Sequence, residues 1–558
     1  MSNRPLRAAL VGVATVALAA GGILAGAVSA NAWPGGHGGP GDHGHSNHDA
    51  ALTPRTQFTM AADGSSGATQ GGEGIPNIDI VKKTIATYYG DPGTGIANKT
   101  SSPYISEMNG IVAKMTAELP RLYASSVAHH PDQKPAIVFD TDDTMLWTYD
   151  QEVGEMHFVF DPAANNTDVL GEVFPATPAM VGFEKAAQQA GFAVFGITGR
   201  SAAQKPASIE NVTKVGYTGF TADNYFTKWA TGEQPSYVTC ATAGCTTVEY
   251  KANTRKHIEN DLHYDIALNV GDQWSDLQGG YSDNAQKLPN PTYYLPSPDL
   301  ASIQQSGVDE RSLQPRTRFT MAADGSSGAT QGGEGIPNID VVKKTIATYY
   351  GDPGTGIANK TDSPYIREMT RIEWQQLPKI AAACYVGKRL HQKPAVIFDT
   401  DDTMLWTYDR EVGTMHFHFD PAQNNQDVLN EVFPATPGMV AFEKAILKAG
   451  CQPIGITGRS AAQKAASIEN VTKVGYIGFT DANYFVKFAA GQKPAYLDCA
   501  AGATCTTIEY KSGTRAYLET KAGGKYRIVA NLGDQYSDLI GGHALFDVKL
   551  PNPTYYLP

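Results

Sequence analysis

The chain has 558 residues, of which 42% are hydrophobic and 18% charged, and its formal net charge is −12 at pH 7. This length accommodates roughly two to four domains of about 150 residues with an ordinary globular composition. The negative charge, without a basic stripe, argues against a nucleic acid polymer as partner, whereas a local site for small phosphate esters is still allowed.

The N-terminus has the pattern of a secretory signal peptide. Arg4 and Arg7 precede an uncharged run over residues 8–28, and residues 30–32 match an A-x-A cleavage site. We therefore predict a signal peptide over residues 1–32 and a secreted protein without stable membrane association. An uncleaved membrane anchor is the alternative, because the run is long enough to span a bilayer.

A flexible segment is expected next, over residues 33–51, which are rich in Gly, Pro and His. Such a composition buries too little apolar surface to order itself. Its histidines suit either loose binding of a transition metal or a plain spacer.

The rest of the chain is an internal repeat. Residues 59–79 recur letter for letter at 320–340, and each copy ends in KLPNPTYYLP. The offset from residue 59 to residue 320 far exceeds the 20–50 residues of solenoid repeats, so each copy is a full domain. The predicted boundaries are 52–296 for the first copy, 297–312 for a polar linker and 313–558 for the second copy.

Within a copy, two helices are expected before the strands. Asn77 can cap a helix that stops at the turn of residues 90–93. Ser102 opens a second helix, with proline at its first position, which is expected to run toward Pro120. Three short apolar runs follow, with helical segments such as 180–190 between them, at 136–139, 193–197 and 266–270. This alternation predicts an α/β fold with a mostly parallel sheet and helices on both faces.

The first apolar run delivers two aspartates, Asp140 and Asp142, and its repeat delivers Asp399 and Asp401. Two carboxylates one residue apart, followed by a hydroxyl, suit a site that needs a nucleophile, a proton donor and a metal. A solvated acidic loop is the alternative for this motif taken alone.

The second run ends in Ile-Thr-Gly-Arg, with Thr198 and Arg200 matched by Thr457 and Arg459. A threonine hydroxyl can donate to a phosphoryl oxygen, and arginine adds a charge-assisted contact. A simple turn is the alternative.

A lysine and a further pair of aspartates complete the set of motifs. Lys251, matched by Lys511, can offset charge on a phosphoryl group, with an ordinary surface lysine as the alternative. The third run ends in Gly-Asp with another Asp four residues on, a pattern that suits Mg²⁺. These aspartates are Asp272 and Asp276 in the first copy and Asp534 and Asp538 in the second.

These four motifs, in this order and present twice, resemble the haloacid dehalogenase (HAD) superfamily of phosphohydrolases. The flanking letters ITGR, EYK and GDQWSDL resemble the secreted class B type acid phosphatases, including the plant vegetative storage protein relatives. The resemblance covers nearly all of each copy. It implies two tandem HAD-like, Rossmannoid domains, each with a small cap insert.

The resemblance also implies a role for each motif. The first aspartate, Asp140 or Asp399, attacks phosphorus to form an aspartyl phosphate, and the second, Asp142 or Asp401, acts as acid and base. The threonines bind phosphoryl oxygens and the lysines offset charge. The residues implied to hold Mg²⁺ are Asp140, Asp142, Asp272 and Asp276, with Asp399, Asp401, Asp534 and Asp538 in the second copy. Thr141 and Asp143 depart from the bacterial pattern of Ile or Leu and Glu, which leaves the subclass open.

Aromatic residues fill the insert after the first strand, including Trp147 and its repeat Trp406. One interpretation is a cap whose aromatics flank the leaving group of the substrate, beside Arg200 and Arg459. Ordinary core packing is the alternative.

Six cysteines in a predicted secreted chain favour disulfides. Cys240 and Cys245 occupy the same place as Cys499 and Cys505, which predicts one short-loop bridge per copy rather than a zinc site. Two cysteines found only in the second copy predict a third bridge, Cys384–Cys451.

The predicted function is that of a secreted, Mg²⁺-dependent acid phosphatase acting on small phosphomonoesters, with two active domains. Phosphotransfer to an alcohol or nucleoside is one alternative. A non-catalytic storage or binding protein on the same fold is the other.

Overall fold

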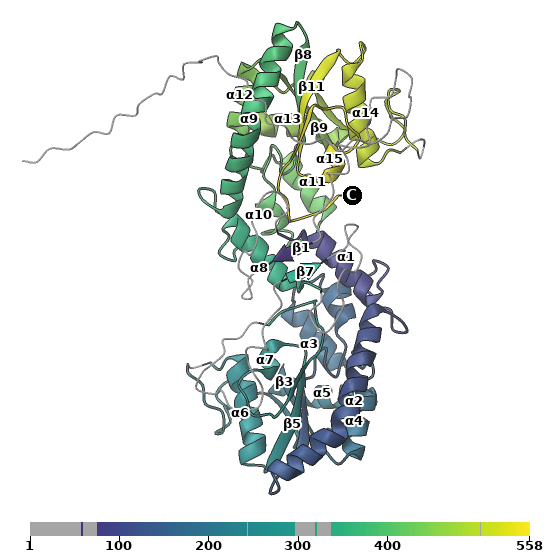
Figure 1. Cartoon of the computed structure of the whole chain (residues 1–558), viewed down its shortest axis with the longest axis vertical. Helices are drawn as coiled ribbons and strands as arrows, with labels where there is room; N and C mark the ends of the chain where they lie inside the picture. Colours follow the sequence, from purple (N-terminus) through teal and green to yellow (C-terminus); the bar gives the residue numbers. More distant parts are fainter. Residues whose placement is uncertain are drawn as a thin grey trace, which may run out of the picture. The chain divides into compact units, whose positions relative to one another are not determined.

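The computed structural model describes residues 57–59, 75–242, 244–295, 318–320, 336–500, 502 and 504–557. The predicted signal peptide, the Gly- and His-rich segment and the linker lie outside these residues. Each copy contains a wholly parallel five-stranded sheet flanked by helices (Figure 1). The strand order is β4-β3-β2-β5-β6 in the first copy and β10-β9-β8-β11-β12 in the second. The predicted fold class, two tandem α/β domains with parallel sheets and helices on both faces, is confirmed.

The strands of the two sheets correspond one to one. In the first copy they are β2 Lys134–Phe139, β3 Ala193–Ser201, β4 Tyr225–Lys228, β5 Tyr264–Gly271 and β6 Ala285–Lys287. In the second copy they are β8 Lys393–Phe398, β9 Gln452–Ser460, β10 Tyr484–Lys487, β11 Tyr526–Gly533 and β12 Phe546–Lys549.

The helices also correspond between copies. The first copy has α1 Ile78–Tyr89, α2 Pro103–His129, α3 Pro162–Gly171, α4 Met180–Gln189, α5 Lys205–Lys214, α6 Thr247–Asn260 and α7 Trp274–Leu277, with short turns η2 Asp150–Glu155 and η3 Ala202–Gln204. The second has α8 Ile339–Tyr350, α9 Pro364–Arg389, α10 Tyr408–Glu411, α11 Pro421–Leu429, α12 Met439–Lys448, α13 Lys464–Lys473, α14 Thr507–Glu519 and α15 Tyr536–Leu539, with η5 Ala461–Gln463 and η6 Asp481–Asn483.

The alternation of side chains along β2 explains why helices cover both faces of the sheet. Ile137 and Phe139 belong to the large apolar cluster that includes α2 and α4, whereas Ala136 and Val138 join a separate cluster with α6. Successive side chains of a strand point to opposite faces, so a strand that is apolar throughout must be buried on both. The polar residues that follow each strand are thereby gathered at one edge of the sheet.

The second helix is longer than its sequence predicts. The expected end at Pro120 is wrong, because α2 continues through this proline to His129, as α9 continues through Pro378. An internal proline removes one helical hydrogen bond and costs about 3 kcal/mol. The buried residues Met115 and Leu119 before it and Leu122 after it hold this helix against the core, and that burial offsets the cost.

Contacts also join the two copies. The short strand β1, Gln57–Thr59, pairs antiparallel with β7, Arg318–Thr320, and these segments are equivalent in the repeat. Helix α1 contacts helix α8. One buried apolar cluster contains residues of both copies, such as Ile78 and Ile339. The copies therefore share part of their hydrophobic core.

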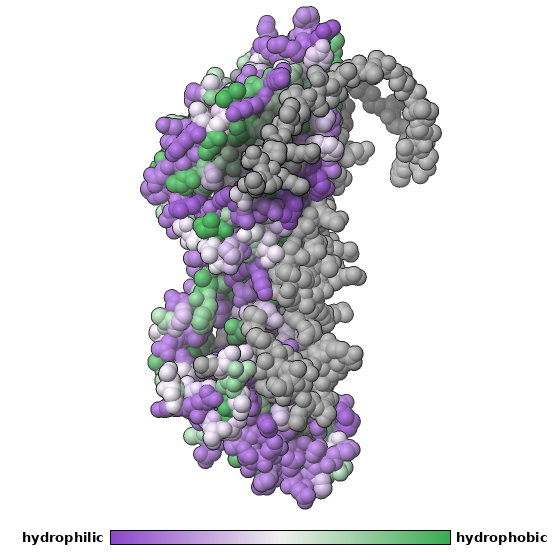
Figure 2. Space-filling model, turned by 90° about the vertical axis from the view of Figure 1, so that its left-hand side faces the viewer, coloured by the Kyte–Doolittle hydropathy of each residue, from purple (hydrophilic) through white to green (hydrophobic). Residues whose placement is uncertain are grey.

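The face shown in Figure 2 is mainly hydrophilic over the described residues, with hydrophobic residues in scattered groups. None of the helices in the described part of the chain combines the length and apolar character needed to span a bilayer.

Candidate active site

The first aspartate of the repeated motif lies where β2 ends. The backbone N–H of Asp140 donates to Val270 O at 2.9 Å, so the sheet ladder continues to this residue. The chain then turns sharply, because Asp143 has a positive φ of 51° and the N–H groups of Met145 and Leu146 both donate to Thr141 O. Strand and turn together fix the Asp140 carboxylate at the sheet edge, with 7% of the residue exposed.

Helix α6 brings the predicted lysine to this carboxylate. A capping box between Thr246 and Glu249 fixes the start of the helix. From its second turn, the buried Lys251 Nζ donates to Asp140 Oδ1 and, at 2.6 Å, to Asp276 Oδ1. Burial opposes the charged ammonium, yet attraction to Asp140 and Asp276 raises the pKa of Lys251 above its ordinary value. The lysine therefore carries a positive charge at the site.

Three buried carboxylates meet around this lysine. Asp140, Asp272 and Asp276 each offer an oxygen, and these atoms lie within 4.8 Å of one another. Burial, followed by repulsion from Asp276, raises the pKa of Asp140 well above its ordinary value. The same causes raise the pKa of Asp272 to about 6. One ammonium does not neutralise three carboxylates, and this all-oxygen donor set fits a divalent cation.

The Asp272 carboxylate is held by two residues that the sequence motifs did not predict. Asn290 Nδ2 donates to Asp272 Oδ2 at 2.8 Å, and Gln273 Nε2 donates to the same oxygen at 2.7 Å. Asn290 also lies 3.4 Å from a carboxylate oxygen of Asp143, whose pKa burial and then Asp272 raise to about 7. The sequence feature that indicates Asn290 is the ending NPTYY, which is identical in both copies.

The second aspartate of the motif is clamped by the predicted arginine. Arg200 Nε donates to both carboxylate oxygens of Asp142, at 3.2 and 3.1 Å, and Nη2 donates to Asp142 Oδ1 at 2.6 Å. Arg200 Nη1 donates to Ser208 Oγ at 3.0 Å, which ties the guanidinium to α5. Such a fork restrains the carboxylate in both position and orientation. Arg459 pairs with Asp401 in the same way.

The predicted threonine lies beside this arginine. Thr198 is buried at 1% exposure in β3, and its Oγ1 accepts a hydrogen bond from Arg200 N at 3.2 Å. The next residues, Gly199 and Arg200, line the cavity that the aspartates face.

This cavity has a volume of about 520 Å³. Its polar floor contains Asp140, Asp142, Lys251 and Asp272, and its apolar wall includes Phe158 and Phe160 from the insert after β2. Two further lining residues, Asp340 and Lys343, come from α8 of the second copy. The volume and mixed lining suit a small molecule with an anionic group.

The predicted cap tryptophans do not line this cavity. Trp147 is 3% exposed and packs against Tyr89 and Tyr104, with Lys99 Nζ 3.9 Å from its ring centroid. Trp406 has equivalent neighbours in the second copy. These positions favour the core-packing alternative, and Phe158 and Phe160 are the insert aromatics that face the cavity.

The second copy repeats this arrangement of side chains. Lys511 Nζ donates to Asp399 Oδ1 at 2.5 Å and to Asp538 Oδ1. Its carboxylate group consists of Asp399, Asp534 and Asp538. Thr457 is buried at 1% exposure, as Thr198 is. Both sites are therefore built from the same residues in the same contacts.

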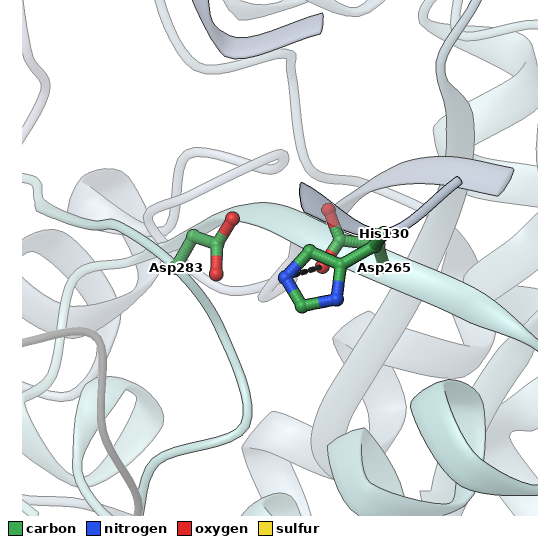
Figure 3. A group of neighbouring side chains, drawn as sticks. All are labelled: His130, Asp265 and Asp283. Carbon is green, nitrogen blue, oxygen red and sulfur yellow. Dashed lines mark ion pairs between the residues drawn. The ribbon is translucent and has the colours of Figure 1, made fainter. Parts of the chain in front are cut away.

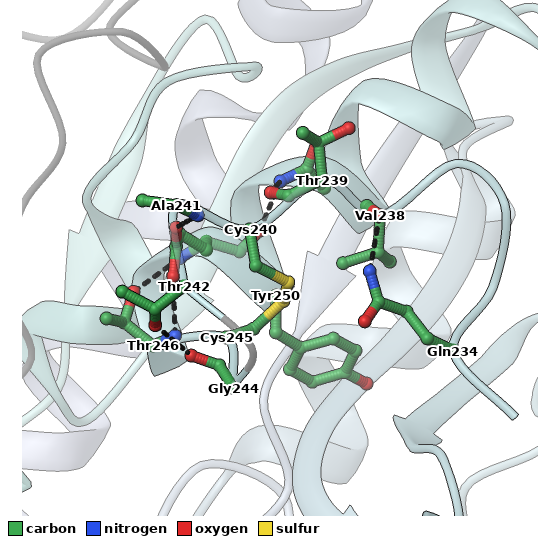
Figure 4. The surroundings of a disulfide bond; sticks show 12 residues. Gln234, Val238, Thr239, Cys240, Ala241, Thr242, Gly244, Cys245, Thr246 and Tyr250 are labelled. Atoms are coloured by element: carbon green, nitrogen blue, oxygen red, sulfur yellow. Dashed lines mark hydrogen bonds between the residues drawn. A yellow bond between two sulfur atoms is a disulfide. The ribbon is translucent and has the colours of Figure 1, made fainter. Parts of the chain in front are cut away.

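The three predicted disulfides are all present, and they pair Cys240 with Cys245, Cys384 with Cys451, and Cys499 with Cys505. The first closes the loop before α6, where Tyr250 lies close to the bridge (Figure 4). In this loop Ala241 N donates to Glu249 Oε1, so the bridge and the capping box together anchor the helix that carries Lys251.

Known proteins of similar sequence point to one family. The sequence profile of a family described as "HAD superfamily, subfamily IIIB (Acid phosphatase)" matches residues 97–296 and 360–558. A protein named stem 28 kDa glycoprotein from Glycine max is 28% identical over 30% of this chain and 62% of its own length. Acid phosphatase 1 from Solanum lycopersicum is 30% identical over 31% of this chain and 64% of its own length. Vegetative storage protein 1 from Arabidopsis thaliana is 28% identical over 29% of this chain and 55% of its own length. The chain thus spans 55 to 64% of the length of these relatives.

Proposed function

Because the chain belongs to subfamily IIIB, the acid phosphatases, of the HAD superfamily, we propose that it is a secreted acid phosphatase that hydrolyses small phosphomonoesters through an aspartyl phosphate. The observation that supports this most directly is the contact of Lys251 with both Asp140 and Asp276, beside an Asp142 held by Arg200. A binding protein needs no restrained acid beside a buried nucleophile. The full set occurs twice, so both copies are proposed to be active.

In the proposed first step, an oxygen of Asp140 forms a bond to phosphorus while the bond from phosphorus to the ester oxygen breaks. Asp142 gives its proton to the leaving oxygen, which departs as an alcohol. In the second step Asp142 takes a proton from water as that water attacks phosphorus, and Asp140 is released with inorganic phosphate. Lys251 offsets the charge that accumulates on the carboxylate and phosphoryl oxygens, and the hydroxyl of Thr198 donates to a phosphoryl oxygen.

The proposed cofactor is Mg²⁺. Asp140, Asp272, the backbone carbonyl of Asp142 and, through its contacts, Asp276 would hold it, and Asp399, Asp401, Asp534 and Asp538 would do so in the second copy. When bound, the ion reduces the repulsion between the phosphate and the attacking carboxylate. The buried carboxylate group described above supports the choice of a hard divalent cation.

Export and domain organisation are part of the same proposal. The signal-peptide pattern of residues 1–32 and the three disulfides favour an oxidising, extracellular compartment. We retain the boundaries 52–296 and 313–558 for the two domains, with linker 297–312 and the Gly- and His-rich segment 33–51. The proposed partners are small phosphomonoesters, with no nucleic acid polymer and no stable membrane association.

A storage role without turnover is the second candidate, because two of the relatives are named for tissue glycoproteins or vegetative storage. Phosphotransfer to an alcohol or nucleoside acceptor would use the same aspartyl phosphate.

The test is hydrolysis of p-nitrophenyl phosphate, with Mg²⁺ and with EDTA, by wild type, Asp140→Asn, Asp399→Asn and the double variant. We expect EDTA-sensitive activity that falls by about half in each single variant and by at least about 10³-fold in the double variant. Adding an alcohol acceptor reports transfer in the same assay. Inactivity of wild type from pH 4 to 9 would leave the storage role as the better account.

A further inference from the structure

The active-site loop at the end of each copy is held by the other copy. In the first copy this loop contains Asn290 and Tyr293, next to the Asp272 carboxylate. Asn338, which caps helix α8 of the second copy, donates from Nδ2 to Asn290 O at 3.0 Å and to Tyr293 O at 2.6 Å. The N–H of Ile339 donates to Pro291 O at 2.9 Å. The cap of a helix in one copy therefore satisfies three backbone carbonyls beside the carboxylates of the other.

The first turn of the same helix also forms part of the cavity wall. Asp340 Oδ2 accepts from Tyr294 N at 3.1 Å, and Asp340 Oδ1 accepts from Lys343 Nζ at 2.9 Å. Lys343 Nζ also donates to Phe158 O in the insert of the first copy. Phe158, Asp340 and Lys343 all line the cavity around Asp140.

At the second site, helix α1 of the first copy makes the same contacts to the loop of the second copy. Asn77 Nδ2 donates to Asn552 O at 3.0 Å and to Tyr555 O at 2.7 Å, and Ile78 N donates to Pro553 O at 2.9 Å. Asp79 Oδ2 accepts from Tyr556 N at 3.1 Å, and Lys82 Nζ donates to Asp79 Oδ1 and to Phe417 O. Each contact of the first site thus has an equivalent partner at the second.

We propose that the two copies complete each other's active sites, with Lys343 as a positioning residue for the site of Asp140 and Lys82 as the positioning residue for the site of Asp399. This inference rests on the proposed phosphatase function of both sites. The partner of each site is then a segment of this same chain.

The role of the lysine follows from what it contacts. Phe158 has a positive φ of 62°, a conformation that is unfavourable for a residue with a side chain. The charge-assisted hydrogen bond from Lys343 to its carbonyl holds the phenyl ring in the cavity wall. The ammonium also places a positive charge in a cavity that contains several carboxylates, which favours the entry of an anionic substrate. Loss of this lysine should therefore weaken substrate binding more than it slows the chemical step.

A crossed experiment separates the two sites within the full chain. Asp399→Asn leaves only the first site active, and Asp140→Asn leaves only the second. In the Asp399→Asn chain, Lys343→Ala should raise KM about tenfold with kcat changed less than about threefold, and Lys343→Arg should restore most of the loss. In the Asp140→Asn chain, Lys82→Ala should have the same effect at the second site. Lys344→Ala, the neighbouring lysine on α8, is the matched control in the first chain.

Hydrogen exchange gives a readout that does not depend on turnover. Lys343→Ala should speed amide exchange in residues 156–160 but not in 415–419, and Lys82→Ala should do the reverse. Equal effects of each variant on both segments, or no effect on either, would overturn the inference even if the enzyme is active. If the wild type is inactive but shows this crossed pattern of hydrogen exchange, the proposed function is overturned. The inference that each copy completes the site of the other then still holds.

A second inference concerns a separate group of side chains in the first copy. His130, Asp265 and Asp283 each offer a ligand atom, and these atoms lie within 4.8 Å of one another. Figure 3 shows the carboxylate of Asp283 facing the imidazole of His130, which forms an ion pair of 3.6 Å with Asp265 Oδ1. Asp265 is 2% exposed, and its other oxygen, Oδ2, is buried without a hydrogen-bond partner. A buried carboxylate oxygen without a donor is costly, and a bound cation would satisfy it.

Among its described residues, the second copy has no equivalent group, because the equivalent positions hold Arg389, Arg527 and Leu545.

The geometry points to a divalent transition-metal site at His130, Asp265 and Asp283, found only in the first copy. One imidazole with two carboxylates suits Zn²⁺ or a similar ion better than Mg²⁺.

Titration of the full chain with Zn²⁺ in the presence of excess Mg²⁺ tests this site by calorimetry. Asp265→Asn and His130→Ala should each bind one Zn²⁺ fewer per chain, or bind it at least about tenfold more weakly. Asp132→Asn, an exposed acid nearby, is the control. Unchanged Zn²⁺ stoichiometry and affinity in both variants would overturn the assignment.

Discussion

The fork between Arg200 and Asp142 is the contact on which the proposed proton transfer depends most. Three hydrogen bonds reach the carboxylate from one guanidinium, while Ser208 holds the guanidinium from the other side. A lysine at this position offers a single point charge and no fork. The orientation of the acid is therefore a property of this pair rather than of the strand alone.

Arg200→Lys should lower kcat about 10- to 100-fold in a chain whose second site is inactivated by Asp399→Asn. The physical reason is that Asp142 keeps a charged partner but loses its fixed orientation. Steady-state kinetics on p-nitrophenyl phosphate measure the effect. Arg121→Lys, on the exposed surface of α2, is the control, and an equal loss in both variants would contradict a specific role for the fork.

The buried Glu152 gives a pH-dependent prediction. Burial, followed by repulsion from Asp143, raises its pKa from 4.5 to about 8, and Glu411 has the same shift for equivalent reasons. The folded state therefore holds these protons to a higher pH than the unfolded state. The resulting stability is fully present below pH 4.5 and is lost as the pH rises to about 8.

Glu152→Gln with Glu411→Gln should reduce this loss, so that the free energy of unfolding falls less between pH 5 and 8 than in wild type. The expected difference is on the order of 2 kcal/mol. Chemical unfolding in EDTA at several pH values measures it. Glu233→Gln, on the surface, should keep the wild-type slope, and a double variant with that same slope would show the prediction to be wrong.

Single residues also mark the limit of what the sequence predicts at the site. The strand-end motifs identify Asp140 and Asp276 because parallel strands gather their ends at one edge. Asn290 follows the short strand β6, which was not predicted, and Lys343 lies on helix α8 of the other copy, so their contacts could not be predicted from the strand-end motifs. Trp147 is close to the motif in sequence but packs in the core, which is one of the two alternatives that the sequence left open.

At the scale of elements, the bridge between α9 and β9 distinguishes the second copy from the first. Cys384 and Cys451 are both buried and are separated by 67 residues. A bridge across a long segment restricts the unfolded chain more than one across a short segment. The bridges between α6 and the loop before it, and between their equivalents in the second copy, span only five and six residues.

Cys384→Ala with Cys451→Ala should lower the free energy of unfolding by about 2 to 4 kcal/mol. Cys499→Ala with Cys505→Ala should lower it less, because that loop is short. Guanidinium unfolding of the two double variants gives the comparison. The ranking of the two effects is the test, and a larger loss from the short-loop pair would contradict the loop-length argument.

Elements were predicted well where burial leaves a strong pattern. The apolar runs that became β2, β3 and β5 are buried on both faces, and the caps Asn77 and Ser102 lie at the helix starts that they predict. Strands β4 and β6 were not predicted, because they are short and only partly buried, so neither alternation nor an apolar run marks them. The predicted end of α2 at Pro120 was too early. Proline disfavours a helix interior, but packing against the core holds the parts of α2 on both sides of it.

For the whole molecule, the shared apolar cluster couples the stability of the two copies. Helices α1 and α8 contact each other, and each also packs within its own copy. Unfolding one copy would expose apolar surface and unsatisfied carbonyls of the other.

Calorimetric unfolding should therefore show one main transition, although the sequence contains two domains. Loss of the bridge between α9 and β9 should shift that transition downward without splitting it. Two separate transitions, of which only one moves in the bridge variant, would contradict the coupling.

The pairing of β1 with β7 has a consequence for how the protein behaves on dilution. Equivalent segments of the two halves lie antiparallel, as in a symmetric dimer, but here a peptide linker joins the halves. Covalent linkage sets an effective concentration of one half for the other on the order of millimolar, whatever the concentration of the protein. Two separate subunits would dissociate on dilution and lose the contacts that each makes to the site of the other. We expect the fused chain to keep these contacts at any dilution, which gives the duplication a use beyond a doubled number of sites.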